Sequence, residues 1–225
     1  MDQKKYVDLF LEKRIEKYDE WIKERRISFS SRIFPVNESL EVKQWVLPSE
    51  HAHKLLKSVD SIALQACECR SHYQRCKNPI DVCLLFDEIA ERILSREKAR
   101  RITTEEAADI LKEANRSGLV HLALYMPNHK IYALCSCCSC CCHEMQIVRE
   151  YGRFELMVHS QYIAETDFSL CINCAICIDR CLFSARRINE NGDLFYNPER
   201  CLGCGLCVSA CPLNATRMKI RGTEV

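Results

Sequence analysis

The sequence predicts an α+β protein with three parts: an N-terminal helix, a mixed cysteine-rich domain, and a C-terminal domain built from two repeated cysteine loops. Three observations support this. Apolar residues recur at helical spacing near the N-terminus, and a second helical pattern is followed by two strand-like stretches. A cysteine pattern then repeats at a period of about 30 residues. We expect the parts to span residues 1–44, 45–160 and 161–225.

The first segment is predicted to be an amphipathic helix. Its polar face carries dense charges of both signs, so docking on protein is favoured over binding to a membrane surface. The apolar positions of this helix are Val7, Phe10, Leu11, Tyr18, Trp21 and Ile22.

Composition narrows the function before any motif is considered. The chain has 225 residues, 32 Lys and Arg against 31 Asp and Glu, and a formal net charge of +1. This balance argues against a nucleic-acid binder, which needs clustered positive charge. The sequence contains no run of about 18 apolar residues, so no membrane span is predicted. The outlier is cysteine, with 18 residues.

So many cysteines indicate either a disulfide scaffold or a metal protein. The N-terminal charges of this chain are not followed by the apolar stretch of a signal peptide. We therefore expect a reducing cytoplasm, where thiols serve mainly as metal ligands.

Ten cysteines lie in the middle domain, in two groups. The first group follows a predicted strand at residues 61–64, and the second follows another strand-like stretch. Neighbouring side chains of an extended chain face opposite ways, so the ten thiols are not expected to serve one site. The ten candidate metal ligands are Cys67, Cys69, Cys76, Cys83, Cys135, Cys137, Cys138, Cys140, Cys141 and Cys142.

Between these groups a helix is expected to start at Thr103 or Thr104 and to end at Gly118. Strands at residues 119–122 and 130–134 then pair around a turn at Pro127-Asn128. A helix followed by such a hairpin has a winged-helix-like outline.

Four interpretations of the ten thiols stay open. A third iron–sulfur cluster is favoured, with ligands drawn from both groups or from the set Cys67, Cys69, Cys76 and Cys83. Structural zinc, redox or sulfur chemistry at the vicinal cysteines, and merely reduced thiols are the others. Of the nearby histidines, His143 is expected to be exposed and His121 to lie in the core or to be hydrogen-bonded.

The C-terminal repeat has the spacing C-x2-C-x2-C-x3-C twice. Three thiolates two residues apart fit a tight loop around one cubane cluster, and in this pattern the fourth cysteine binds the other cluster. Cluster one would be bound by Cys171, Cys174, Cys177 and Cys211. Cluster two would be bound by Cys201, Cys204, Cys207 and Cys181.

Local residues support the loops. Gly203 and Gly205 allow positive φ in the second loop, and Asn173 and Ala175 hold these places in the first. Residues 187–196 are expected to form a hairpin turning at Asn191-Gly192. Zinc knuckles are disfavoured, since they use paired CxxC units without the x3 tail.

Residues 162–220 resemble the bacterial-type dicluster ferredoxin family. The resemblance implies two [4Fe–4S] clusters close enough to exchange electrons. The first repeat has Leu182 where the second has Pro212, a departure that removes no ligand.

Residues 45–220 also resemble a family of 4Fe–4S binding proteins from anaerobes. Its pattern is a Val-Leu-Pro segment (Val46-Leu47-Pro48), C-x-C-R, a C-x6-C pair, G-L-V-H and C-x-C-C-x-C-C-C, followed by the dicluster module. The resemblance implies no established reaction. Oxygen-sensitive thiolates and clusters are consistent with an anaerobic host.

The predicted function is intracellular electron transfer through two [4Fe–4S] clusters, with a further metal or cluster site in the cysteine-rich domain. The charge of the C-terminal module is balanced, so we expect electrons to pass to its own N-terminal domain or to a stable redox protein partner. The alternative is a redox enzyme or a metal- or sulfur-handling protein whose active site lies among Cys67–Cys142. A sensor with a winged-helix-like head is the third hypothesis.

Overall fold

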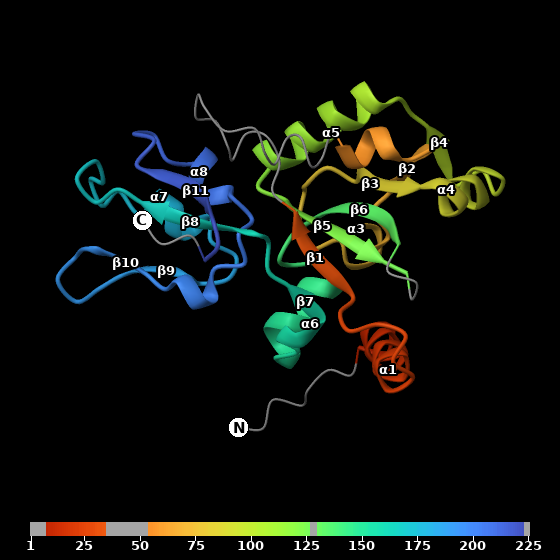
Figure 1. Cartoon of the computed structure of the whole chain (residues 1–225), viewed down its shortest axis with the longest axis horizontal. Helices are drawn as coiled ribbons and strands as arrows, with labels where there is room; N and C mark the ends of the chain where they lie inside the picture. Colours follow the sequence, from red (N-terminus) through yellow and green to blue (C-terminus); the bar gives the residue numbers. More distant parts are fainter. Residues whose placement is uncertain (1–7, 35–53, 127–129, 223–225) are drawn as a thin grey trace.

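The computed structural model describes residues 8–34, 54–126 and 130–222. They form a larger lobe around a seven-stranded sheet and a smaller C-terminal lobe (Figure 1). The α+β class is confirmed. The Val46-Leu47-Pro48 segment and the turn at Pro127-Asn128 lie outside the described residues.

The larger lobe contains helices α1 (Leu9–Lys23), α3 (Glu68–Tyr73), α4 (Asp87–Leu94), α5 (Thr104–Arg116) and α6 (His143–Tyr151), and the short 3₁₀ helix η2 (Phe154–Leu156). Its strands are β1 (Ser31–Phe34), β2 (Ile62–Ala66), β3 (Asp81–Phe86), β4 (Ala99–Arg101), β5 (Val120–Tyr125), β6 (Ile131–Cys137) and β7 (Met157–Val158). The strand order is β4-β2-β3-β6-β5-β1-β7.

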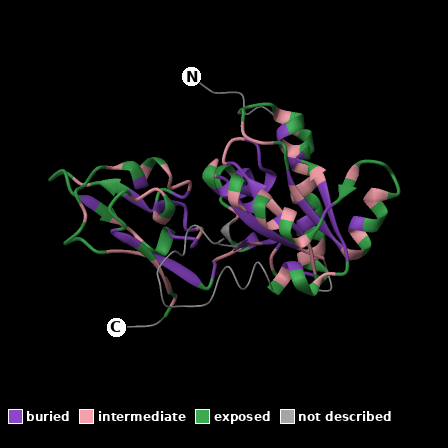
Figure 2. Ribbon diagram, turned by 90° about the horizontal axis from the view of Figure 1, so that it is seen from above, coloured by how far each residue is buried: buried purple, intermediate pink, exposed green. Residues whose placement is uncertain are grey.

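The sheet is antiparallel except for the β1–β7 pair at one edge. Its two faces bury different helices, because successive residues of a strand alternate between faces. Leu84 and Leu134 pack with Leu111 of α5 on one face. Leu85 and Ala133 belong to the core on the opposite face, which also contains Met145 of α6. Figure 2 shows the strands buried in the interior and the outer sides of the helices exposed.

The predicted helix after residue 103 is confirmed. Thr103 is the N-cap of α5, and its Oγ1 accepts a hydrogen bond from the backbone N–H of Glu106 at 3.2 Å. Gly118 follows the helix with a φ of 77°, and β5 and β6 then form an antiparallel hairpin.

The winged-helix-like outline is not confirmed. The helix and the hairpin are present, but β5 and β6 are inner strands of the seven-stranded sheet, with β1 and β3 on their outer sides. Strand β1 also joins part of the predicted 1–44 extension to this sheet. The division at residues 44 and 160 stays a prediction.

Helix α1 docks on the protein, as its apolar stripe predicts. Leu11 and Tyr18 are buried with Ile147 of α6 and Leu156. Asp8 caps the helix, with Oδ1 accepting hydrogen bonds from the N–H groups of Phe10 and Leu11.

The C-terminal lobe contains β8 (Tyr162–Thr166), α7 (Ile176–Asp179), β9 (Arg186–Ile188), β10 (Leu194–Tyr196), the 3₁₀ helix η3 (Pro198–Arg200), α8 (Leu206–Ser209) and β11 (Thr216–Ile220). Two antiparallel pairs, β8–β11 and β9–β10, hold the two cysteine loops. The predicted hairpin is the β9–β10 pair, with Gly192 at a φ of 84°.

The second loop docks onto the larger lobe. Leu202 and Leu206 are 3% and 1% exposed and belong to the same buried core as Val120 and Met145. Their counterparts in the first loop, Ile172 and Ile176, are 65% and 44% exposed. Nearly identical loops therefore have different surroundings.

Candidate metal centres

The two C-terminal loops have matching backbone conformations. Gly203 and Gly205 have φ values of 77° and 80°, and Asn173 and Ala175 adopt 53° and 65° at the equivalent positions. A Cβ added to Gly203 would lie 2.1 Å from the carbonyl oxygen of Tyr162. That position therefore requires glycine for space as well as for backbone conformation.

The first four-cysteine set lines one cavity. Cys171, Cys174 and Cys177 come from the first loop, and Cys211 reaches the same cavity from the second repeat. This placement agrees with the predicted ligand set of cluster one. Their role as ligands stays a prediction.

The second set meets in the other loop. Cys204 faces Cys201, Cys207 and Cys181, and burial together with the proximity of these thiols raises its pKa. Burial also raises the pKa of Cys207 to about 12. Buried thiols that resist ionisation in this way need a bound cation to hold them as thiolates.

Backbone donors repeat in both halves. The N–H of Ala185 lies 3.3 Å from Cys181 Sγ, and the N–H of Ala215 lies 3.2 Å from Cys211 Sγ. Such N–H···S contacts stabilise negative charge on a cluster sulfur and so influence its reduction potential.

A family comparison agrees with this geometry. Residues 170–215 match the 4Fe-4S dicluster domain family. The C-terminal segment is a ferredoxin-like iron–sulfur domain. A search of curated proteins finds no match to the chain.

The ten upstream thiols divide into two groups. The four-thiol group consists of Cys76, Cys138, Cys140 and Cys141. The six-thiol group consists of Cys67, Cys69, Cys83, Cys135, Cys137 and Cys142, which line a separate cavity. This grouping agrees with the expectation that the ten thiols do not serve one site, which stays a prediction.

The four-thiol group has the spacing of a mononuclear site. Its sulfurs all lie within 4.8 Å of one another. Cys76 Sγ is 3.8 Å from Cys138 Sγ and 4.0 Å from Cys141 Sγ, and Cys140 Sγ is 3.8 Å from Cys141 Sγ. A tetrahedral ion with metal–sulfur bonds of about 2.3 Å holds its ligands about 3.8 Å apart. The four thiols therefore fit one tetrahedral ion.

Donors lie near two thiols of this group, while burial raises the pKa of Cys140 and of Cys141. Asn78 Nδ2 lies 3.5 Å from Cys76 Sγ, and Arg70 Nη1 lies 3.7 Å from Cys138 Sγ. Although burial opposes it, the Arg70 guanidinium lowers the pKa of Cys138.

The six-thiol cavity has a volume of about 220 Å³. Cys83 and Cys135 are direct cross-strand neighbours on β3 and β6, and Cys137 follows two residues later on the same face. Cys67 and Cys142 are the N-cap residues of α3 and α6. The sheet and the two helix starts thus supply thiols from opposite sides.

Arg70 connects the two groups. It lines the six-thiol cavity, is 3% exposed, and donates from Nη1 and Nη2 to the carbonyl oxygen of Ser136 at 3.1 Å. A buried guanidinium beside several thiols compensates the negative charge that metal binding requires there.

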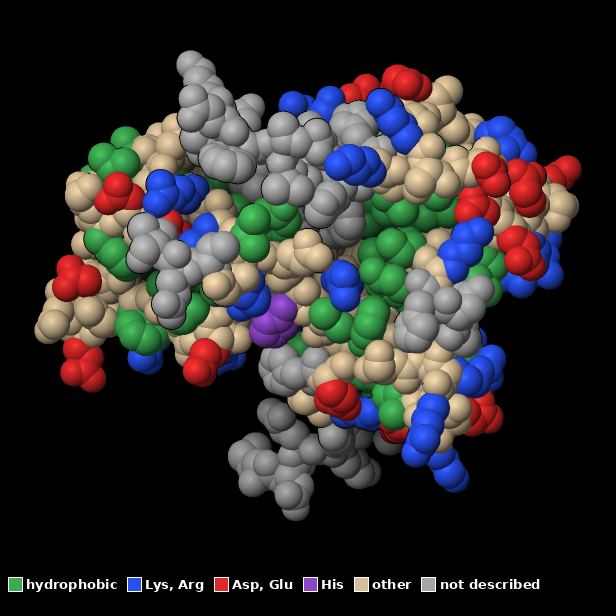
Figure 3. All heavy atoms as spheres, viewed as in Figure 1, with side chains coloured by type: hydrophobic (Ala, Val, Ile, Leu, Met, Phe, Trp, Pro, Cys, Tyr) green, Lys and Arg blue, Asp and Glu red, His purple; other side chains and the backbone are tan. Residues whose placement is uncertain are grey.

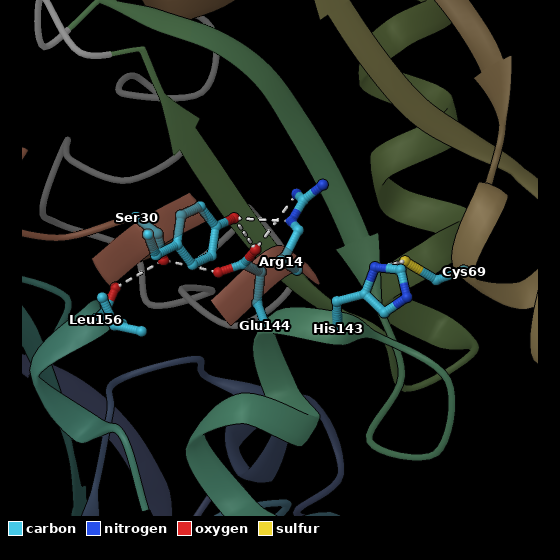
Figure 4. Close-up of polar contacts among 7 residues, drawn as sticks. Arg14, Ser30, Cys69, His143, Glu144 and Leu156 are labelled. Atoms are coloured by element: carbon cyan, nitrogen blue, oxygen red, sulfur yellow. Dashed lines mark hydrogen bonds and ion pairs between the residues drawn. The ribbon is translucent and has the colours of Figure 1, made fainter. Parts of the chain in front are cut away.

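A polar network lies where α1 meets the cavity (Figure 4). His143 Nδ1 lies 3.4 Å from Cys69 Sγ. The neighbouring Glu144 points toward α1, where it accepts a hydrogen bond from Tyr18, and it pairs with Arg14 at 3.4 Å. Ser30 Oγ donates to Glu144 Oε2 at 2.7 Å.

The candidate set Cys67, Cys69, Cys76 and Cys83 stays a prediction: the four residues pack in one cluster, although Cys76 also meets Cys138, Cys140 and Cys141 and does not line the six-thiol cavity. The structure corrects two predictions. His143 is 4% exposed rather than solvent-facing, since it begins α6 beneath α1. Cys135 and Cys137 lie within β6 rather than after it.

His121 is buried and hydrogen-bonded, as predicted, with Nδ1 3.0 Å from Ser136 Oγ. The sequence pattern did not predict a role for Arg70 or Arg186. A charged residue beside a cysteine motif was the available signal for Arg70. Nothing in the local pattern distinguished Arg186 from the exposed Arg187.

Among the residues that the structure describes, no helix is long and apolar enough to cross a membrane.

Proposed function

We propose that this protein is a cytoplasmic electron carrier with two [4Fe–4S] clusters in its C-terminal domain. One observation carries the proposal: each loop supplies three thiols and receives a fourth from the other repeat. This is the ligand pattern of two neighbouring cubanes. Cysteine thiolates would hold the irons, and electrons would pass between clusters without any proton or group transfer.

The assignment of an exchange partner to each cluster follows from the unequal surroundings of the two loops. Cluster one lies beneath exposed apolar residues, whereas the loop of cluster two is docked on the larger lobe. We therefore assign cluster one to exchange with a redox protein partner and cluster two to exchange with the larger lobe. The apolar residues around cluster one are Phe168, Leu170, Ile172, Ile176 and Leu213.

The surface charge does not favour a nucleic-acid partner. On the face shown in Figure 3, basic and acidic side chains are interspersed, and hydrophobic side chains reach the surface of the C-terminal lobe on the left. Phosphate binding needs a continuous basic surface.

The four-thiol group is proposed as a further metal site, with zinc as its ion. Its sulfur spacing supports one tetrahedral ion rather than a cubane, whose cysteines each bind a different iron. This site would stabilise the connection between α3, the following loop and the start of α6.

The ligand assignment is tested by combining variants and counting iron in protein purified without oxygen. Cys211→Ser should remove about four irons. Adding Cys174→Ser should remove no more, since both residues would bind cluster one. Adding Cys204→Ser instead should raise the loss to about eight irons. The reverse result, a loss of about eight irons with Cys174→Ser and about four with Cys204→Ser, would contradict the exchange of fourth ligands between repeats.

A redox enzyme is the second candidate function, and the six-thiol cavity is the observation that favours it. The cavity continues past the thiols to Tyr132, Leu124 and Ile89, which leaves room beside any bound metal. Adding cyanide, which binds to iron at an open coordination position, distinguishes a redox enzyme from an electron carrier. An iron with an open coordination position should change its EPR spectrum, whereas full cysteine ligation should leave the spectrum unchanged.

A further inference from the structure

The six-thiol cavity differs from the four-thiol group in number, spacing and space. Six cysteines exceed what one tetrahedral ion binds. Within the described residues, no three donors of the cavity meet the 4.8 Å mutual spacing that the four-thiol group meets. The cavity of about 220 Å³ between them is far larger than a single ion needs.

Core packing does not account for this arrangement. Well-packed interiors leave few voids larger than a water molecule. Here the sheet pair Cys83–Cys135 and the helix starts at Cys67 and Cys142 all line one cavity. A polynuclear centre, whose metals each bind a separate thiolate, suits a set of sulfurs of which no three lie within 4.8 Å of one another.

Charge in the cavity agrees with an anionic centre. A cluster ligated by thiolates has a net negative charge. The guanidinium groups of Arg70 and Arg14 both line the cavity, although Arg14 is paired with Glu144. His143 adds a buried ring whose Nε2 has no hydrogen-bond partner among the described residues.

The cavity also borders the ferredoxin-like domain. Cys137 and Cys142 belong to the same buried core as Leu202 and Leu206, and Cys204 packs against that core. The loop of cluster two therefore lies against the wall of the cavity.

We propose that the six-thiol cavity binds a third iron–sulfur cluster, separate from the four-thiol site. It would accept electrons from cluster two, a role that rests on the proposed electron-transfer function. In each step cluster two is oxidised by one electron and the cavity cluster is reduced by one, with no proton transferred. The electron enters from the redox partner at cluster one.

Metal analysis of the full chain tests the proposal. The chain purified without oxygen should contain about twelve irons, four for each of three cubanes, and one zinc. Cys83→Ser/Cys135→Ser should lose about four irons and keep its zinc. The matched control Cys76→Ser/Cys138→Ser should lose zinc and keep all its iron.

Either of two results would overturn the third cluster: about eight irons in the unmodified chain, or full iron in the Cys83→Ser/Cys135→Ser variant. Because these cysteines lie on inner strands, the variant can fail to fold. Reductive titration of the unmodified chain does not depend on whether this variant folds. Three clusters take up about three electrons per chain, and two take up about two.

Failure of the C-terminal assignment gives a different result. Cys171→Ser/Cys201→Ser should lose about eight irons and keep the cavity cluster. If that variant loses no iron while Cys83→Ser/Cys135→Ser still loses about four, the dicluster assignment fails and the cavity cluster stands.

Discussion

Arg186 lies between the two cysteine loops of the ferredoxin-like domain. It is 2% exposed, its Nη1 lies 3.8 Å from Cys177 Sγ, and its charge acts on both Cys177 and Cys207. A fixed positive charge at this point stabilises the more negative, reduced state of either cluster. The adjacent Arg187 is exposed and stacks on Phe195 instead.

We predict that Arg186→Gln lowers the reduction potentials of the C-terminal clusters by on the order of 100 mV. One charge about 6 Å away at an effective dielectric constant of about 20 contributes about 3 kcal/mol. Redox titration followed by EPR measures the shift. Arg187→Gln is the control, and an equal shift in both variants would contradict a specific role for the buried guanidinium.

His121 makes stability depend on pH. Burial lowers its pKa to about 3, whereas an unfolded histidine has a pKa of about 6.5. Below pH 6.5 the unfolded chain binds a proton that the folded chain does not bind. The stabilisation is therefore complete above pH 6.5 and is lost as the pH falls toward 3.

The contribution of His121 to the slope of the free energy of unfolding against pH is expected to be up to about 1.4 kcal/mol per pH unit. His121→Asn can keep the hydrogen bond to Ser136 but does not titrate, so it should lose this part of the slope. Anaerobic denaturant unfolding between pH 7 and pH 5 measures the difference. If the free energy of unfolding changes with pH equally in the unmodified protein and in His121→Asn, His121 does not contribute to the pH dependence of stability.

The grouping of the C-terminal cysteines could be predicted from local spacing. Each loop contains three thiols within seven residues, and the other repeat supplies the fourth thiol of the set. The upstream thiols were different. Their grouping depends on Cys83 lying opposite Cys135, which requires the register and order of β2, β3 and β6. Cys83 and Cys135 are 52 positions apart and meet only once the sheet forms, so sequence spacing did not separate Cys76 from Cys67.

At the scale of elements, helix α1 covers the region next to the six-thiol cavity. Phe10 packs edge-on against the ring of His143, and Tyr18 hydrogen-bonds to the buried Glu144. The amphipathic pattern predicted this helix and its docking. It did not predict which surface the helix covers, because His143 and Glu144 lie more than 100 positions later in the sequence.

Tyr18→Phe should destabilise the protein by about 1–3 kcal/mol, because Glu144 loses a buried hydrogen-bond donor. The hydroxyl of Tyr18 also accepts a hydrogen bond from Arg14 Nε at 3.0 Å. Glu16→Gln, at an exposed position of α1, should change stability by less than about 0.5 kcal/mol. Anaerobic chemical unfolding measures the free energy of unfolding of both variants. Equal losses in Tyr18→Phe and Glu16→Gln would show that the hydrogen bond between Tyr18 and Glu144 does not stabilise the protein.

At the scale of the whole molecule, the internal repeat provides its own matched control. Leu206 is buried against the larger lobe, whereas its counterpart Ile176 is 44% exposed. Of the two cysteine loops, the second therefore packs against the larger lobe, together with Phe183 and Arg180 from the end of the first repeat.

Leu206→Ala should lower the stability of the full chain by about 2–5 kcal/mol, and Ile176→Ala by less than about 1 kcal/mol. Thermal unfolding of the iron-loaded proteins measures both. Similar losses would indicate that the second loop is not docked in solution.

The unequal surroundings of the two loops also set an order for assembly and repair. An iron–sulfur donor protein reaches the first loop in the finished molecule, but it reaches the second loop only before the two lobes meet. If the second loop binds a cluster as proposed, that inner cluster would be inserted before the lobes close, and damage to it would persist until they part. We expect a chelator to remove the outer cluster first and the inner cluster only at the rate at which the lobes separate.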